Sequence, residues 1–291
     1  MCYDCSVPDS TPAAGASRRS FARFLAAGAG LTVLAACTPE APAQVPPSST
    51  TLPPAASPSP VAVATTESPT AAVEPVPEAP VAPSPAATLP RQFSLTDPAS
   101  PWLVVNKHRP LVPADYVPAD LVQPNVRIIA SGEAALLNST TAAAAEAMFA
   151  TAAQDGVSIT LASGYRSYST QVATYNGYVA ARGHADADTA SARPGYSEHQ
   201  TGWSFDIGDG GGACGFQPCF ADQPSAVWVK ANGHRFGFIV RYPWMFHPIT
   251  GYYYEPWHLR YVGVEAATDM VKSGVNTLEE YFGVEAAAAY P

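Results

Sequence analysis

The segment from residue 38 to residue 98 lacks the residue types that build a folded core. It contains no Gly, Tyr or Trp and a single Phe, while 16 of the 30 prolines of the chain lie within it. Such a segment cannot bury enough apolar surface to offset the entropy lost on ordering. The sequence therefore predicts a Pro/Ala-rich disordered linker over residues 37–98 and one folded domain over residues 99–291.

Basic residues are also scarce. The chain has 15 Lys and Arg against 24 Asp and Glu, a formal net charge of −9, and no basic cluster lies in the expected folded part. Proteins that bind nucleic acid present such a cluster, so this pattern excludes nucleic acid as a partner. We expect the folded domain to be a monomer.

The apolar run over residues 24–36 is too short to span a bilayer, which takes about 20 residues. It follows Arg18-Arg19, a pattern typical of a twin-arginine export signal. It ends in Leu34-Ala35-Ala36-Cys37, which resembles the lipobox of bacterial lipoproteins. We expect residues 1–36 to be a lipoprotein signal peptide and a lipid on Cys37 to anchor the exported protein at the outer face of the cytoplasmic membrane, in the cell envelope. The alternative is an ordinary signal peptide with a chance cysteine.

Helix and strand patterns follow one another irregularly along the folded part. Because they do not alternate, we expect an α+β fold with a small antiparallel sheet flanked by helices. Ser139 or Thr140 is the expected cap of the first helix and Ser169 that of the second. The predicted helices cover residues 140–155, 169–182 and 225–232, with a capping box at 277–280, and the predicted strands cover residues 157–161, 203–207, 238–240 and 252–254.

Two cysteines remain in the folded part, Cys214 and Cys219. In an oxidising compartment such a closely spaced pair is most simply a disulfide that closes a small loop. Metal binding is the alternative, but no second cysteine pair is present to complete a structural zinc site.

Two histidines differ from the other four because each has carboxylates at short spacing. His199 is expected at the end of a loop and Asp206 on the strand that follows it, with Gly202 allowing the chain to turn between them. The segment Glu255-Pro256-Trp257-His258 adds a second pair, although a regular strand would place residues three apart on opposite faces. Because Pro256 cannot continue a central ladder, we expect a bend that brings Glu255 and His258 to one site.

This set of residues has the composition of a hydrolytic zinc site. Two His and one Asp leave an open position on Zn²⁺, where the pKa of water falls to about 7, and a glutamate can then take the proton. Peptide hydrolysis also needs positive charge where the oxyanion develops, and Arg166 is the candidate. The alternative for Arg166 is a surface ion pair.

Three segments resemble the VanY-type D-alanyl-D-alanine carboxypeptidases, zinc enzymes that trim the stem peptide of peptidoglycan. They occur in the family's order, within a resemblance that runs from about residue 105 to residue 263. The resemblance implies a small α+β fold shared with the hedgehog signalling domain. The segments are Ser163-Gly164-Tyr165-Arg166-Ser167 with Gln171, Ser197-x-His199-x-x-Gly202-x-x-x-Asp206, and Glu255-Pro256-Trp257-His258.

The resemblance also implies roles for individual residues. His199, Asp206 and His258 correspond to the zinc ligands of the family. Glu255 corresponds to the general base that later acts as acid, and Arg166 to the residue that stabilises the substrate carbonyl.

Substrate contacts are implied in the same segments. Gln171 and Ser197 are expected to bind the terminal carboxylate of the substrate, and Tyr165 and Trp257 are further candidates for substrate binding. Ser204 stands where the family often has alanine, a change that we expect to leave the ligands untouched.

The implied activity is the zinc-dependent removal of terminal D-alanine from peptidoglycan stem peptides. An L,D-carboxypeptidase, an endopeptidase of the wall and a catalytically silent wall-binding module are the alternatives. The folded part has no Ser-x-x-Lys and no His-Glu-x-x-His motif, which disfavours a serine-nucleophile peptidase and a thermolysin-like protease.

Overall fold

The computed structural model describes residues 89–291. The predicted signal peptide, the lipid on Cys37 and most of the predicted linker lie outside the described residues. Within the described part, no helix is long and apolar enough to cross a membrane. The fold begins before the predicted boundary at residue 99, because Leu95 is buried against Trp102 and its carbonyl accepts a hydrogen bond from Arg109.

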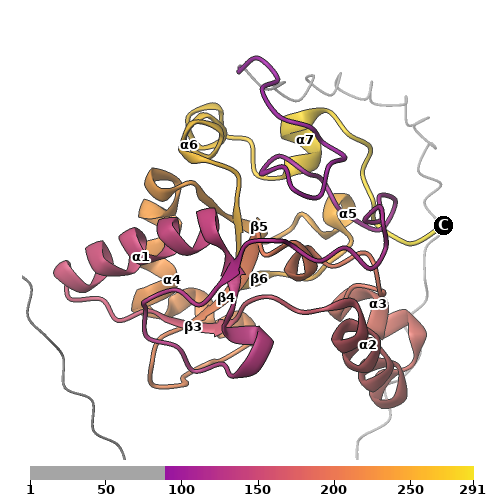
Figure 1. Ribbon diagram of the computed structural model, residues 1–291, viewed down its shortest axis with the longest axis horizontal. Helices are drawn as coiled ribbons and strands as arrows, with labels where there is room; N and C mark the ends of the chain where they lie inside the picture. Colours follow the sequence, from indigo (N-terminus) through magenta and orange to yellow (C-terminus); the bar gives the residue numbers. More distant parts are fainter. Residues whose placement is uncertain (1–88) are drawn as a thin grey trace, which may run out of the picture. The chain divides into compact units, whose positions relative to one another are not determined.

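A four-stranded antiparallel sheet lies at the centre of the domain, in the order β3-β4-β6-β5 (Figure 1). Its strands are β3 (Thr160–Ser163), β4 (Ser204–Gly208), β5 (Phe238–Tyr242) and β6 (Glu255–Tyr261), and a separate pair is formed by β1 (Leu121–Val122) and β2 (Leu137–Asn138). The expected α+β fold with a small antiparallel sheet is confirmed. The strand predicted at residues 252–254 is wrong, because the ladder begins only at Glu255.

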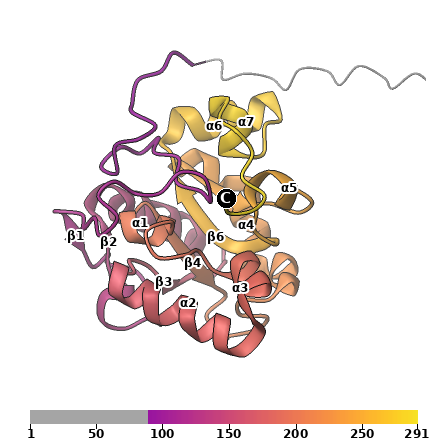
Figure 2. The ribbon, with the colours of Figure 1, turned by 90° about the vertical axis from the view of Figure 1, so that its right-hand side faces the viewer.

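Helices surround the sheet, with α6 and α7 together at one end of the domain and α2 and α3 at the other (Figures 1 and 2). The predicted helices are confirmed, but the first two are capped by Asn138 and Ser167, whose side chains accept from the backbone N–H three residues on. Thr277 caps the last helix as expected. The helices are α1 (Ser139–Gln154), α2 (Tyr168–Arg182), α3 (His184–Ala190), α4 (Pro224–Asn232), α5 (His247–Thr250), α6 (Val264–Ser273) and α7 (Leu278–Phe282), with 3-10 turns at Gly132–Ala135, Glu198–Thr201, Pro218–Asp222 and Gly233–Phe236.

The main core lies between α1, α4 and one face of the sheet. Small and large apolar residues of α1 pack there against the inward side chains of β3, β4 and β6, and Trp228 of α4 closes the cluster. A second cluster joins α6 and α7 to Trp102. The main core therefore covers one face of the sheet, and on the other face β4 and β6 can present polar residues.

Candidate active site

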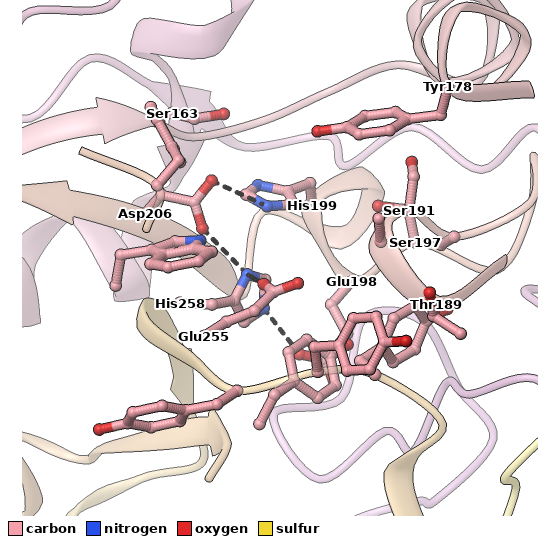
Figure 3. Close-up of a pocket in the computed structure, with 18 of the residues that line it drawn as sticks. Ser163, Tyr178, Thr189, Ser191, Ser197, Glu198, His199, Asp206, Glu255 and His258 are labelled. Atoms are coloured by element: carbon pink, nitrogen blue, oxygen red, sulfur yellow. Dashed lines mark hydrogen bonds and ion pairs between the residues drawn. The ribbon is translucent and has the colours of Figure 1, made fainter. Parts of the chain in front are cut away.

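His199, Asp206 and His258 converge although they come from three separate elements. His199 lies on the 3-10 turn Glu198–Thr201, Asp206 on β4 and His258 on β6, and all three are buried. Asp206 lies between the two imidazoles, with Oδ2 3.4 Å from His199 Nε2 and Oδ1 3.0 Å from His258 Nδ1 (Figure 3). One donor atom from each residue lies within 4.8 Å of the others, which is the spacing that a single metal ion requires.

Strand register and one glycine bring these side chains together. Asp206 and His258 are direct cross-strand partners in the antiparallel pair of β4 and β6, so their side chains share one face of the sheet. Gly202 has a φ of +67°, which turns the chain back from His199 to β4. A Cβ at this position would lie 2.7 Å from the backbone nitrogen of Asn138, so only glycine fits.

Each imidazole uses one nitrogen for a protein contact and turns the other toward Asp206. His199 Nδ1 donates to the carbonyl of Gly164 at 2.7 Å, which leaves Nε2 for the cluster. His258 Nε2 lies 3.3 Å from Glu198 Oε2, which leaves Nδ1 for the cluster. Metal-binding histidines are commonly oriented in this way by a carbonyl or carboxylate on the second nitrogen. The donor set of two imidazole nitrogens and a carboxylate oxygen therefore fits Zn²⁺.

Glu255 lies beside the cluster because β6 is bulged. Val240 pairs with Leu259 but Tyr242 pairs with Glu255, so four residues of β6 span the length of two residues of β5. Pro256 falls inside this bulge, where its missing N–H breaks no regular ladder. The irregularity turns Glu255 and His258 toward one site, with Glu255 Oε2 3.9 Å from His258 Nδ1. The bend expected at Pro256 thus takes the form of a β-bulge within a continuous strand.

The buried charges of the site shift one another's protonation. Burial raises the pKa of Glu255 to about 7, despite the opposing charge of His258. Burial acts to lower the pKa of His258, but hydrogen bonds to Asp206 and Glu198 outweigh it and raise the pKa to about 9. Asp206 has a pKa well below its usual range because both imidazoles outweigh the effect of its burial. At neutral pH Asp206 is therefore ionised and can bind a cation, while Glu255 can take up and release a proton.

Arg166 lines the same pocket and is held by two hydrogen bonds. Its Nε donates to Gln171 Oε1, and its backbone N–H donates to the carbonyl of His199 at 3.3 Å. Burial lowers the pKa of Arg166, while the charges of Asp206 and Glu255 oppose that shift. The guanidinium of Arg166 is therefore buried close to the charges of Asp206 and Glu255 and does not form a surface ion pair.

The four predicted substrate contacts divide into two pairs. Ser197 and Trp257 line the pocket, which has a volume of about 590 Å³. Gln171 and Tyr165 are buried and do not line it. The side-chain amide of Gln171 is already used by Arg166, Ser191 and the carbonyl of Ala192, so its place in the structure is that of a support for Arg166.

Glu198 is a site residue that sequence reasoning missed. It is 2% exposed, and its Oε1 accepts from Arg241 at 2.8 Å and from Arg260 at 3.0 Å, while Oε2 faces His258. The hydroxyl of Ser204 also donates to Glu198 Oε2 at 3.0 Å. Ser204 therefore contacts no predicted ligand directly, but it contacts the carboxylate that orients His258. The motif around His199 does not predict the ion pairs of Glu198, because Arg241 and Arg260 lie 43 and 62 residues away in sequence.

We expect Glu198→Gln to lower the free energy of unfolding at pH 7 by about 3 to 5 kcal/mol, because it leaves the buried guanidinium of Arg260 without its carboxylate partner. Burial acts to raise the pKa of Glu198, but the charges of Arg241 and Arg260 outweigh it and hold the pKa well below the usual range. A depressed pKa stabilises the fold above the unfolded-state value of about 4.3 and stops doing so as the pH falls toward the folded-state value. The difference should therefore be full above about pH 5 and shrink on further acidification.

Urea unfolding of the parent and the variant at several pH values measures this difference. Glu146→Gln is the matched control, because within residues 89–291 this exposed carboxylate accepts only the backbone N–H of Asn125, and the change should alter stability by less than about 0.5 kcal/mol. Equal stability of parent and Glu198→Gln at pH 7 would show that the buried network contributes nothing to the fold.

Comparison with known proteins agrees with this geometry. Residues 134–264 match the VanY family, described as D-alanyl-D-alanine carboxypeptidase. The putative carboxypeptidase YodJ of Bacillus subtilis (strain 168) is 38% identical over 191 residues, 65% of this chain and 69% of that protein.

Solved structures of similar proteins extend the match to three dimensions. The LdcB LD-carboxypeptidase is 38% identical, with a TM-score of 0.60, and the match covers 65% of this chain and 88% of the LdcB chain. A second similar structure is that of a variant of the vancomycin resistance D,D-pentapeptidase VanY in complex with Zn(II). It is 35% identical, with a TM-score of 0.51, and the match covers 62% of this chain and 97% of the VanY chain.

A buried His/Asp/His cluster beside an unliganded glutamate, on one face of the two central strands of a small antiparallel sheet, defines a mononuclear metallopeptidase site. The chain belongs to the VanY family of D-alanyl-D-alanine carboxypeptidases.

Proposed function

We propose that this protein is a zinc-dependent carboxypeptidase that removes the terminal D-alanine from peptidoglycan stem peptides. The observation that carries the proposal is the convergence of His199, Asp206 and His258 beside Glu255 in a chain of the VanY family. The same four residues argue against a silent wall-binding module, because such a module has no use for a glutamate placed to exchange protons.

His199 Nε2, an Asp206 oxygen and His258 Nδ1 are the proposed ligands. Zn²⁺ held there would lower the pKa of water to about 7 and polarise the scissile carbonyl. Glu255 takes the proton of the attacking water and returns it to the leaving amine, a role that suits a carboxyl whose pKa is raised to about 7 by burial.

Arg166 is the proposed donor to the oxygen of the scissile carbonyl. A hydrogen-bond donor placed where the negative charge of the oxyanion develops stabilises the transition state. Gln171 holds the guanidinium through Nε, which leaves the terminal nitrogens of Arg166 for the substrate. Ser197 and Trp257 line the same pocket and are proposed to contact the peptide.

A second candidate activity is that of an L,D-carboxypeptidase acting on tetrapeptides. The similarity to the LdcB LD-carboxypeptidase favours this activity, because the two structures compare with a TM-score of 0.60. Both activities use the same metal chemistry, so the three ligands do not discriminate between them.

The function is tested by incubating the purified protein, loaded with zinc, with a stem pentapeptide that ends in D-Ala-D-Ala and, separately, with the tetrapeptide. Mass spectrometry of the products should show loss of one alanine from the pentapeptide and an intact tetrapeptide. Cleavage of the tetrapeptide alone would assign the L,D-activity instead. An internal cut in a cross-linked peptide would assign an endopeptidase, and no cleavage of any of these peptides would refute the proposal.

We also propose that the enzyme acts outside the cytoplasm, where peptidoglycan lies. The twin-arginine pattern at residues 18–19 and the lipobox-like segment ending in Cys37 support export and a lipid anchor. Metabolic labelling with a fatty acid, compared between the parent and Cys37→Ser, measures the anchor directly.

A further inference from the structure

A disulfide-closed loop forms part of the pocket wall. Residues 209–223 connect β4, which carries Asp206, to α4, and within them Cys214 and Cys219 form the disulfide expected from their spacing. Their Cα atoms lie 5.6 Å apart. Three residues enclosed by this disulfide, Phe216, Gln217 and Pro218, line the pocket that also holds the metal cluster.

The backbone of this loop is held in an uncommon conformation. Among residues 89–291, three residues other than glycine have positive φ, and two of them are Cys214 and Phe216, each at 54°. Such conformations cost on the order of 1 to 3 kcal/mol each and persist only where the surroundings impose them. They are also concentrated at sites that hold ligands.

The loop is fixed at both ends while its middle projects. Phe220 is fully buried in the main core, and Cys214 packs against the same core. Gln217 donates its backbone N–H to the carbonyl of Cys214 at 3.0 Å, and Phe220 donates to Gln217 at 2.9 Å. Phe216 nevertheless remains 50% exposed, so the fold anchors the loop and leaves this ring uncovered.

The uncovered ring lines the same pocket as the reacting groups. Phe216 contacts Trp257 edge to face, with ring centroids 6.0 Å apart and an angle of 73° between the planes. Trp257, the residue before His258 on β6, lines this pocket as well, so the two aromatic rings form an apolar part of the wall of the pocket that holds the metal cluster. An apolar ring that a ligand covers loses contact with water and favours binding.

We propose that Phe216 is a substrate-contacting residue, whose ring covers the apolar surface of the stem peptide next to the scissile bond, and that the Cys214–Cys219 disulfide positions this ring. The inference rests on the proposed function for the identity of the peptide. The two terminal D-alanines each carry a methyl group of the size that such a wall accommodates.

Phe216→Ala should raise KM for the pentapeptide roughly five- to tenfold and leave kcat within about twofold, because the ring contacts the peptide equally in the ground state and the transition state. Phe216→Leu keeps an apolar side chain and should restore KM to within about twofold of the parent. Phe93→Ala is the matched control, since this phenylalanine is also about half exposed but packs on Trp102 outside the pocket.

The positioning role of the disulfide is tested by the double variant Cys214→Ala/Cys219→Ala, which keeps the ring but frees the loop. KM should rise by a similar factor, while the zinc content per chain and kcat stay at the parental values. A double variant with unchanged KM, beside a Phe216→Ala variant with raised KM, would overturn the positioning role alone.

Different results would overturn the Phe216 contact and the proposed activity. If the parent cleaves the pentapeptide and Phe216→Ala has the parental KM, the contact is overturned and the function stands. If the parent cleaves none of the peptides, calorimetric titration of the pentapeptide into the parent and into Phe216→Ala still decides whether the ring contacts a stem peptide. Equal affinity, or no binding to either, overturns the contact.

Discussion

Replacing Glu255 by glutamine is expected to lower kcat for the pentapeptide by about 10² to 10⁴-fold while the protein keeps its metal. Glutamine has the same shape as glutamate but cannot take the proton of the attacking water. It is not one of the three proposed ligands, so His199, Asp206 and His258 remain in place. Initial rates and the zinc content per chain, measured on the same preparation, check both parts of the prediction.

Glu265→Gln is a suitable control, because this glutamate on α6 is exposed, its side chain is hydrogen-bonded to that of Gln92, and it does not line the pocket, so its replacement should leave kcat unchanged. A Glu255→Gln enzyme that cleaves the pentapeptide at the parental rate would remove Glu255 from the mechanism. Loss of zinc along with activity would instead make Glu255 necessary for metal binding.

Removing the metal with a chelator is expected to abolish hydrolysis, and adding Zn²⁺ back should restore it. In the metal-free protein, hydrogen bonds to Asp206 and Glu198 outweigh burial and raise the pKa of His258 to about 9. A ligand imidazole must be neutral, so zinc binding at neutral pH should release a proton and the apparent affinity should rise with pH up to about 9.

Activity, zinc content and calorimetric titration of Zn²⁺ at several pH values measure these expectations. Titration in two buffers of different ionisation enthalpy reports the proton release. Full activity in protein from which the metal has been removed would exclude the metallopeptidase mechanism, and affinity independent of pH would exclude His258 as the ligand that loses its proton.

Much of the candidate site was predictable because its residues stand in short motifs whose residue types and spacing are typical of a zinc site. His199, Asp206, Glu255 and His258 were recognisable from residue type and spacing, and the structure places them together. Helix ends followed from local capping chemistry, although the caps proved to be Asn138 and Ser167 rather than their neighbours. The disulfide followed in the same way from the close spacing of its two cysteines.

Residues that act through distant partners were not predictable. Glu198 gains its place from Arg241 and Arg260, which come from two different strands. Gln171 and Tyr165 belong to the recognised motif, yet they are buried and do not line the pocket. The strand expected at residues 252–254 begins only at Glu255, because pairing with β5 decides where the ladder starts.

The sequence by itself determined the class of fold, the family and the chemical groups of the site, because periodicity, capping and ligand type are local properties of the chain. Only the tertiary structure decided which nitrogen of each histidine faces the cluster, how the bulge turns Glu255 toward His258, and which buried carboxylate holds the site in place. These features depend on strand register and on burial between segments that are far apart in sequence, and no local pattern encodes them.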